Sequence, residues 1–169
     1  MTSTRHVLLA VDGNEYSERA FYWYIRHLAK PGDQLALLQI LPHHNAPATE
    51  ELVSYDQQPA RDGSNRDQIL KAQNLYNDYG ERLMCTIQQD PALSDFLKDQ
   101  MTYRAYVKRS SNIGAGIVDT QNRLGVDIIV MGTRSLNMLK RTFLGSVSDY
   151  VLHHATVPVA VVPPPAEHE

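Results

Sequence analysis

The sequence predicts an α/β fold: a single domain around a five-stranded, parallel, doubly wound, Rossmann-like sheet with helices on both faces. Three observations lead to this class. Short, almost wholly apolar runs alternate along the chain with segments whose apolar residues recur at helical spacing. Continuous apolar runs indicate strands that are buried on both faces, as in parallel sheets. The 169 residues are 43% hydrophobic and 21% charged, which suits one domain with a sizeable core.

The first 64 residues are predicted to form two strands, one helix and a long loop. Apolar runs at residues 7–11 and 35–41 predict the strands. Between them, the apolar positions of residues 17–28 follow helical spacing, and a Pro-Gly-Asp sequence ends that helix. Residues 42–64 contain three prolines and no clear period, so we expect a long surface loop there.

The rest of the chain continues the alternation. Its predicted elements are, in order, a helix at 65–88, a helical turn or two at 92–98, a strand at 101–107, a helix at 113–124, a strand at 126–131, a helix at 146–154 and a strand at 157–162. Ser111 or Asn112 is expected to cap the helix at 113–124, and Gly125 to end it. Residues 163–169 begin with three prolines and are expected to be a disordered tail.

Composition excludes several classes of protein. The formal net charge is −3 and no apolar run is long enough to cross a membrane, so we expect a cytoplasmic protein that binds neither nucleic acid nor membrane. The single cysteine, Cys85, excludes a disulfide within the chain and is expected to be a small buried or half-buried side chain. Adjacent helical side chains point about 100° apart, so exposure and helix packing explain His153 and His154 better than a metal site does.

Residues 131–135 and 145–148 predict a phosphate site. Met131-Gly132-Thr133-Arg134-Ser135 ends an apolar strand in a basic loop, and Gly145-Ser146-Val147-Ser148 opens a helix. Glycine permits close approach of the backbone, hydroxyls can hydrogen-bond a phosphate, and a helix N-terminus carries partial positive charge. Because the carboxyl ends of parallel strands share one edge, we expect Asp12, Ile40 and Gly132 to converge on one crevice.

The same residues resemble a known family. The spacing Gly132-x2-Ser135-x9-Gly145-Ser146 resembles the universal stress protein signature, Gly-x2-Gly-x9-Gly-Ser/Thr. Four further stretches resemble that family in the right order, so that the resemblance extends over residues 5–162. They read VDGNEYS at 11–17, VDIIVMG at 126–132, GSVSDYVLHHA at 145–155 and VPVAVV at 157–162.

The resemblance implies a domain of five strands that binds ATP or AMP, with or without Mg²⁺ carried by the phosphates near Asp12, and no metal held by the protein alone. It implies that Asp12 lies beside the nucleoside, that the backbone of Ile40 contacts adenine, and that the two glycine-containing segments hold ribose and phosphates. The full set that it implies is Ala10, Val11, Asp12, Ile40, Met131, Gly132, Thr133, Arg134, Ser135, Gly145, Ser146, Val147 and Ser148.

Three of these residues have an alternative interpretation. Asp12 positions ribose or a phosphate-bound cation, or it caps the turn before the first helix. Arg134 pairs with phosphate, or it is a solvated loop cation. Ser146 binds phosphate, caps its helix, or does both.

Ser135 is the departure from the family pattern, because the second glycine of the motif is expected there. A side chain at positive φ costs about 1 kcal/mol, so we expect weakened or rearranged binding rather than its abolition.

Three functions follow in order of preference: a nucleotide-binding regulator of the stress response, a homodimeric interaction or scaffold protein that has lost nucleotide binding, and a slow ATPase. We expect a homodimer that pairs through the edge strand at 157–162.

Overall fold

The computed structural model describes residues 4–44, 51–56, 65–89, 101–134 and 145–165. Its elements are β1 (Arg5–Ala10), α1 (Glu15–Trp23), the π-helical segment η1 (Tyr24–Leu28), β2 (Asp33–Pro42), β3 (Val53–Ser54), α2 (Arg66–Gln89), β4 (Thr102–Ser110), α4 (Ile113–Leu124), β5 (Ile128–Gly132), α5 (Ser146–His154) and β6 (Val159–Val162). The predicted helical turn at 92–98 and Ser135 lie outside the described residues, as does most of the predicted tail. The α/β class is confirmed.

The strands form one sheet in the order β3-β4-β2-β1-β5-β6. The five predicted strands are all present, and all their pairings are parallel. The predicted strand count of five is wrong, because β3 adds a sixth strand inside the region expected to be a loop and pairs antiparallel with β4. Two residues are too few to show a period, so pairing with β4 and burial define this strand rather than its own sequence.

The strand predicted at 101–107 is longer than its apolar pattern. Its partner β2 runs to Pro42, and the pairing continues to the register of Pro42 with Ser110. Backbone pairing therefore extends β4 by three residues beyond the predicted end.

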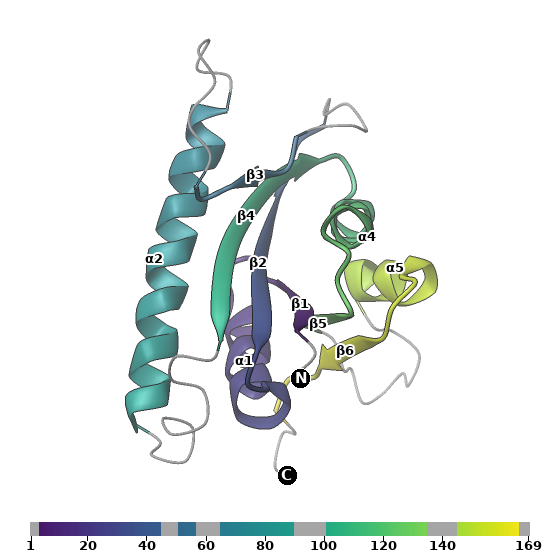
Figure 1. Cartoon of the computed structure of the whole chain (residues 1–169). Helices are drawn as coiled ribbons and strands as arrows, with labels where there is room; N and C mark the ends of the chain where they lie inside the picture. Colours follow the sequence, from purple (N-terminus) through teal and green to yellow (C-terminus); the bar gives the residue numbers. More distant parts are fainter. Residues whose placement is uncertain (1–3, 45–50, 57–64, 90–100, 135–144, 166–169) are drawn as a thin grey trace.

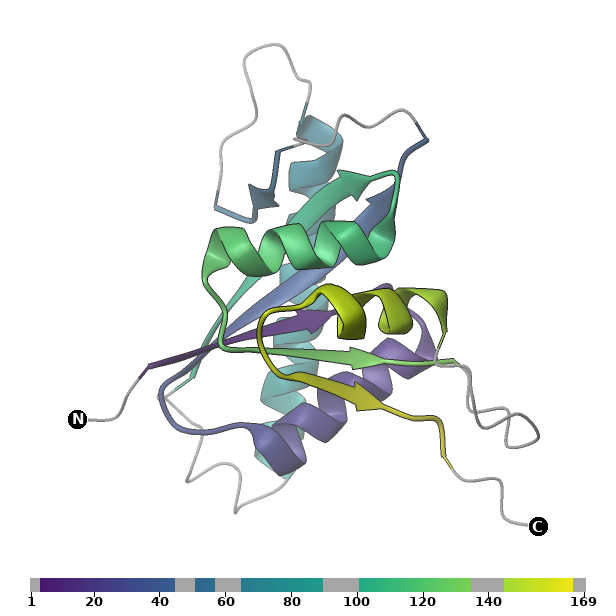
Figure 2. The same cartoon turned by 90° about the vertical axis from the view of Figure 1, so that its right-hand side faces the viewer.

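Helices cover both faces of the sheet, with α1 and α2 on one face and α4 and α5 on the other (Figures 1 and 2). Successive residues of β1 point to opposite faces, so Val7 and Leu9 join the core under α1 and α2 while Leu8 joins the core under α4 and α5. All three side chains are fully buried. Burial on both faces explains why the strand sequences are continuous apolar runs.

Asparagine caps fix the starts of two helices. Asn14 accepts hydrogen bonds from the amides of Tyr16 and Ser17 at the start of α1. Asn112 accepts one from Ala115 at the start of α4. Asn112 rather than Ser111 is therefore the cap of α4, and Gly125 ends that helix in the left-handed conformation, with φ of 60°.

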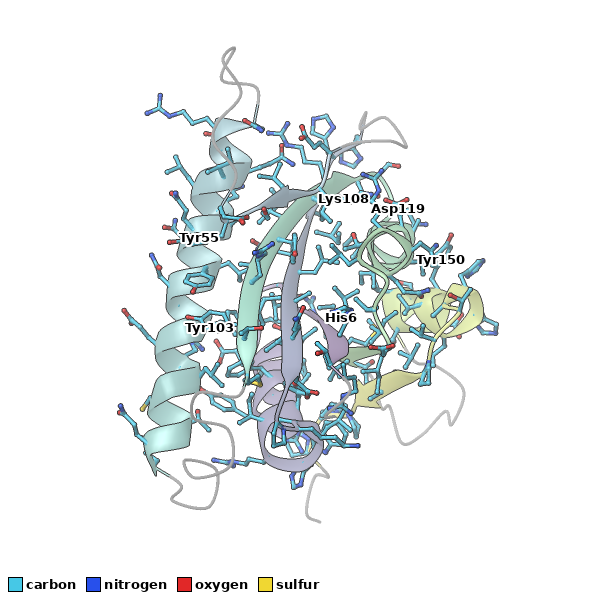
Figure 3. The ribbon with its side chains drawn as sticks, viewed as in Figure 1. His6, Tyr55, Tyr103, Lys108, Asp119 and Tyr150 are labelled. Atoms are coloured by element: carbon cyan, nitrogen blue, oxygen red, sulfur yellow. The ribbon has the colours of Figure 1, made fainter. Side chains whose placement is uncertain are left out.

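Side-chain contacts fasten the helices to the sheet (Figure 3). Lys108 of β4 is almost fully buried and forms an ion pair with Asp119 of α4. On the opposite face, Tyr76 of α2 stacks between Tyr55 and Tyr103, with ring centroids 4.2 and 4.5 Å apart. This stack holds the residues after β3 against α2 and β4.

None of the helices in the described ranges combines the length and the apolar character that crossing a membrane requires.

Candidate functional site

A cleft of about 320 Å³ opens at the carboxyl edge of the sheet, within the size range of small-molecule sites. It lies at the ends of β1, β2 and β5 and is closed by the first turns of α1, α4 and α5. The chain leaves β1 for α1 on one face and β5 for α5 on the other, while β1 and β5 are neighbours. The cleft therefore lies at the topological switch point, where doubly wound sheets bind ligands.

The structure brings the residues singled out from the sequence together around this cleft, apart from Ser135, which lies outside the described residues. They are Ala10, Val11, Asp12, Ile40, Met131, Gly132, Thr133, Arg134, Gly145, Ser146, Val147 and Ser148.

Six further residues, which the sequence analysis did not assign to the site, also line the cleft. They are Asn14, Tyr16, Ser17, Leu38, Ile113 and Ile117. Two kinds of signal could have found half of them. Leu38 is two residues before Ile40 and so shares its face of the strand, and Ile113 and Ile117 share one face of α4. Asn14, Tyr16 and Ser17 reach the cleft because of how α1 packs, which the local pattern does not show.

One half of the cleft is apolar. The side chains of Leu38, Ile40 and Ile117 are each less than a tenth exposed. Helix α4 lies close to the end of β2 there, since a Cβ on Gly116 would come within 3.1 Å of the Ile40 side chain. This half of the cleft is an apolar slot, which suits an apolar group.

The other half of the cleft presents the N-terminus of α5. Within the described residues, α5 has no side-chain cap, unlike α1 and α4. The cap position belongs to Gly145, so the alternative in which Ser146 caps the helix is wrong. The buried hydroxyl of Ser148 donates to the carbonyl of Gly145 over 2.9 Å. In the part of the chain that the structure describes, the first amides of α5 thus have no capping side chain as acceptor at the wall of the cleft, and such amides bind anions.

Gly132 and Gly145 are glycines for different reasons. A Cβ on Gly132 would lie 2.3 Å from the backbone oxygen of Tyr16, closer than any contact a Cβ can make. Among the described residues, a Cβ on Gly145 would meet nothing closer than 3.8 Å, and the φ of −54° at Gly145 suits any residue. The packing of β5 against α1 therefore requires Gly132, whereas the part of the chain that the structure describes leaves room at Gly145. Close approach of the Tyr16 backbone is thus a structural reason for Gly132, in addition to its place in the lining of the cleft.

Asp12 and Arg134 face each other across the cleft, with Nη2 of Arg134 3.3 Å from Oδ2 of Asp12. The Asp12 carboxylate also accepts hydrogen bonds from Asn14, at 2.6 Å from the side-chain amide and 3.2 Å from the backbone amide. Asp12 therefore stabilises the turn before α1, as one alternative had it, although Asn14 is the cap of that helix.

The remaining titratable candidates lie away from the cleft. His153 and His154 are exposed, and each Nδ1 lies 2.8 Å from the backbone oxygen four residues earlier in α5. Cys85 is exposed on α2, so the prediction of a buried or half-buried thiol is wrong. A thiol is small enough for either environment, and the orientation of α2 alone decides between them. No group of three or more potential metal-ligating side chains occurs among the residues that the structure describes.

The sequence is similar to one family of known proteins. The model of the universal stress protein family matches residues 3–163. Universal stress protein PHOS32 of Arabidopsis thaliana is 29% identical over 171 residues, which cover 98% of this chain and 67% of that protein. The chain spans about two thirds of the length of the curated Arabidopsis relatives that it matches.

Solved structures have the same fold. A universal stress protein family protein of Arabidopsis thaliana with AMP bound is similar at a TM-score of 0.56 and 15% identity, covering 96% of this chain and 93% of that one. A universal stress protein in complex with cAMP is similar at a TM-score of 0.54 and 16% identity, covering 94% and 95%. At such identities the likeness establishes the fold alone.

Proposed function

The chain belongs to the universal stress protein family, and from that premise we propose that it is a cytoplasmic, adenine-nucleotide-binding regulator of the stress response. The observation that carries the proposal is the two-part cleft, in which an apolar slot and an uncapped helix N-terminus share one cavity. A nucleotide has the same division into a flat base and an anionic phosphate. The AMP and cAMP complexes of two proteins with this fold support the choice of adenine.

In this proposal the base enters the slot beside Ile40, Leu38 and the two isoleucines of α4. The ribose lies beside Asp12, whose carboxylate can accept hydroxyl hydrogen bonds. The phosphates lie at Gly145 and Ser146, where the α5 amides and the nearby Arg134 would neutralise them. ATP and AMP both fit this division, and Mg²⁺ would arrive with the phosphates of ATP rather than on ligands of the protein.

A second candidate is an interaction protein of the same fold that has lost nucleotide binding. The observation in its favour is Ser135, which stands in the position of a motif glycine. This candidate predicts that the protein binds its partner equally well with and without nucleotide, and that Ser135→Gly creates nucleotide binding.

The first test is ligand linkage. The purified protein is examined by mass spectrometry for co-purified adenine nucleotide, and its melting temperature is measured with adenosine, AMP, and ATP with Mg²⁺. Ligand at about 100 times its Kd stabilises the native state by about 2.7 kcal/mol, so the melting temperature should rise by several degrees. No bound nucleotide and no shift at millimolar ligand would count against nucleotide binding.

Gly145→Ala is the variant that separates the site from the fold. The ligand-free melting temperature should fall only slightly, because the described residues leave room for the added methyl group and the remaining loss is that alanine caps a helix less well than glycine. The affinity for AMP should fall by about tenfold, because the methyl group occupies space that the proposal gives to phosphate. Unchanged affinity for AMP in this variant would place the phosphate elsewhere.

A further inference from the structure

The ion pair between Asp12 and Arg134 joins the two walls of the cleft. Asp12 follows β1, and Arg134 follows β5 by two residues. Among the described residues that line the cleft, Asp12 is the one carboxylate and Arg134 is the one cation. In the ligand-free protein these two charged side chains of the cleft therefore form an ion pair with each other.

The pair is poised to exchange partners. The side chains of Asp12 and Arg134 are 50% and 71% exposed, and ion pairs that water reaches this freely are weak. Asp12 would keep both of its hydrogen bonds from Asn14 if the guanidinium left. Departure of Arg134 therefore leaves no unpaired buried charge behind.

Arg134 also lies beside the anion-binding end of the cleft. Its neighbour Thr133 accepts a hydrogen bond from the amide of Gly145 over 3.5 Å, which joins the end of β5 to the start of α5. A phosphate at the α5 amides would offer the guanidinium two oxygens in the paired geometry that arginine prefers.

We propose that Asp12 competes with the phosphate of the ligand for Arg134, and thereby sets how much a phosphate group adds to the affinity for a nucleoside. This inference rests on the proposed function. The site would then discriminate between phosphorylated and unphosphorylated adenine compounds. Arg134 would favour the phosphorylated ones, and Asp12 would limit that preference.

The test is a double-mutant cycle on the ratio of two dissociation constants, that for adenosine divided by that for AMP, measured by calorimetry at fixed ionic strength. Using the ratio cancels any effect of Asp12 on ribose binding. Asp12→Asn should raise the ratio about two- to fivefold, because the guanidinium is released from an exposed ion pair. Arg134→Gln should lower it by about tenfold, because a charged contact to phosphate is lost.

The double variant distinguishes competition for Arg134 from simple repulsion between Asp12 and phosphate. In an Arg134→Gln background, Asp12→Asn should leave the ratio unchanged. Asp78→Asn is the matched control: it makes the same change of charge at an exposed ion pair on α2, outside the set of residues that line the cleft, and should leave the ratio at the wild-type value. Melting temperatures of all variants check that each one folds.

A ratio that Asp12→Asn does not raise, or that it raises equally with and without Arg134, overturns the inference alone. Wild-type protein that binds neither adenosine nor AMP overturns the proposed function as well.

Discussion

At the scale of single residues, Gly132 and Gly145 belong to one sequence motif and yet have different physical roles. Gly132 lets the end of β5 pass against the backbone of Tyr16, whereas Gly145 lies where the protein leaves space open. Only at Gly132 does the packing of the protein oppose a side chain. Their substitutions should therefore affect different properties, although the chemical change is the same methyl group.

Gly132→Ala should lower stability in the ligand-free protein. Its methyl group would have to displace the backbone of the first turn of α1, and overpacking of this kind costs about 1–3 kcal/mol. In a chain of this size that corresponds to a fall of about 3–10 °C in melting temperature, measured by circular dichroism. A melting temperature equal to that of Gly145→Ala would contradict the distinction between the two glycines.

At the scale of elements, a hydrogen-bond network around Asp33 joins β1, β2 and the end of the first helix. It lies at the edge of the sheet opposite the cleft. The carboxylate of Asp33 is 1% exposed and accepts hydrogen bonds from Arg5 at 2.6 and 3.0 Å, from Tyr24 at 2.7 Å and from the amide of Lys30 at 2.9 Å. Burial, and then this carboxylate, raises the pKa of Tyr24, so that the phenol stays a hydrogen-bond donor. The network fixes the starting register of β1 and β2, on which the position of the cleft at their other ends depends.

Asp33→Ala should be strongly destabilising, by about 3–5 kcal/mol in urea titrations, because it leaves Arg5 and Tyr24 without their shared acceptor. Asp78→Ala provides the comparison: its ion pair with Arg82 is exposed and should contribute less than about 1 kcal/mol. Similar losses of unfolding free energy in the two variants would show that the Asp33 network contributes no more stability than an exposed ion pair.

At the scale of the whole molecule, β6 is the last strand of the sheet that the described residues form, and there it pairs with β5 on one side only. The carbonyls of Pro158 and Val162 accept hydrogen bonds from the amides of Ile129 in β5 and of Thr133, the residue after β5. Because hydrogen bonding alternates along a strand, the backbone groups of Val159 and Val161 point away from β5. An edge of this kind invites pairing with a second copy of the chain across a two-fold axis.

If the homodimer proposed from the sequence forms through this edge, Val161→Pro should convert it to a monomer. Proline removes one outward N–H and no bond to β5, so the monomer should keep its helical circular dichroism. Light scattering after size-exclusion chromatography measures the mass. A wild-type monomer, or a dimer that survives the proline, would exclude pairing through β6.

The sequence by itself determined the class of fold, the order of the five parallel strands along the chain and the edge of the sheet at which the cleft lies. Apolar runs and helical spacing are local patterns, and parallel strands end at one edge whatever their packing. The sequence predicts both ends of the helix at 113–124 because its cap directly precedes it in the chain and its terminating glycine directly follows it.

Only the tertiary structure decided the rest. The two-residue strand β3 exists because β4 offers it a partner. The need for glycine at position 132 comes from the carbonyl of Tyr16, which lies 116 residues earlier in the chain. The ion pair of Asp12 with Arg134 spans a similar separation, of 122 residues. Contacts between segments so far apart depend on how the helices pack on the sheet, and no local pattern records that packing.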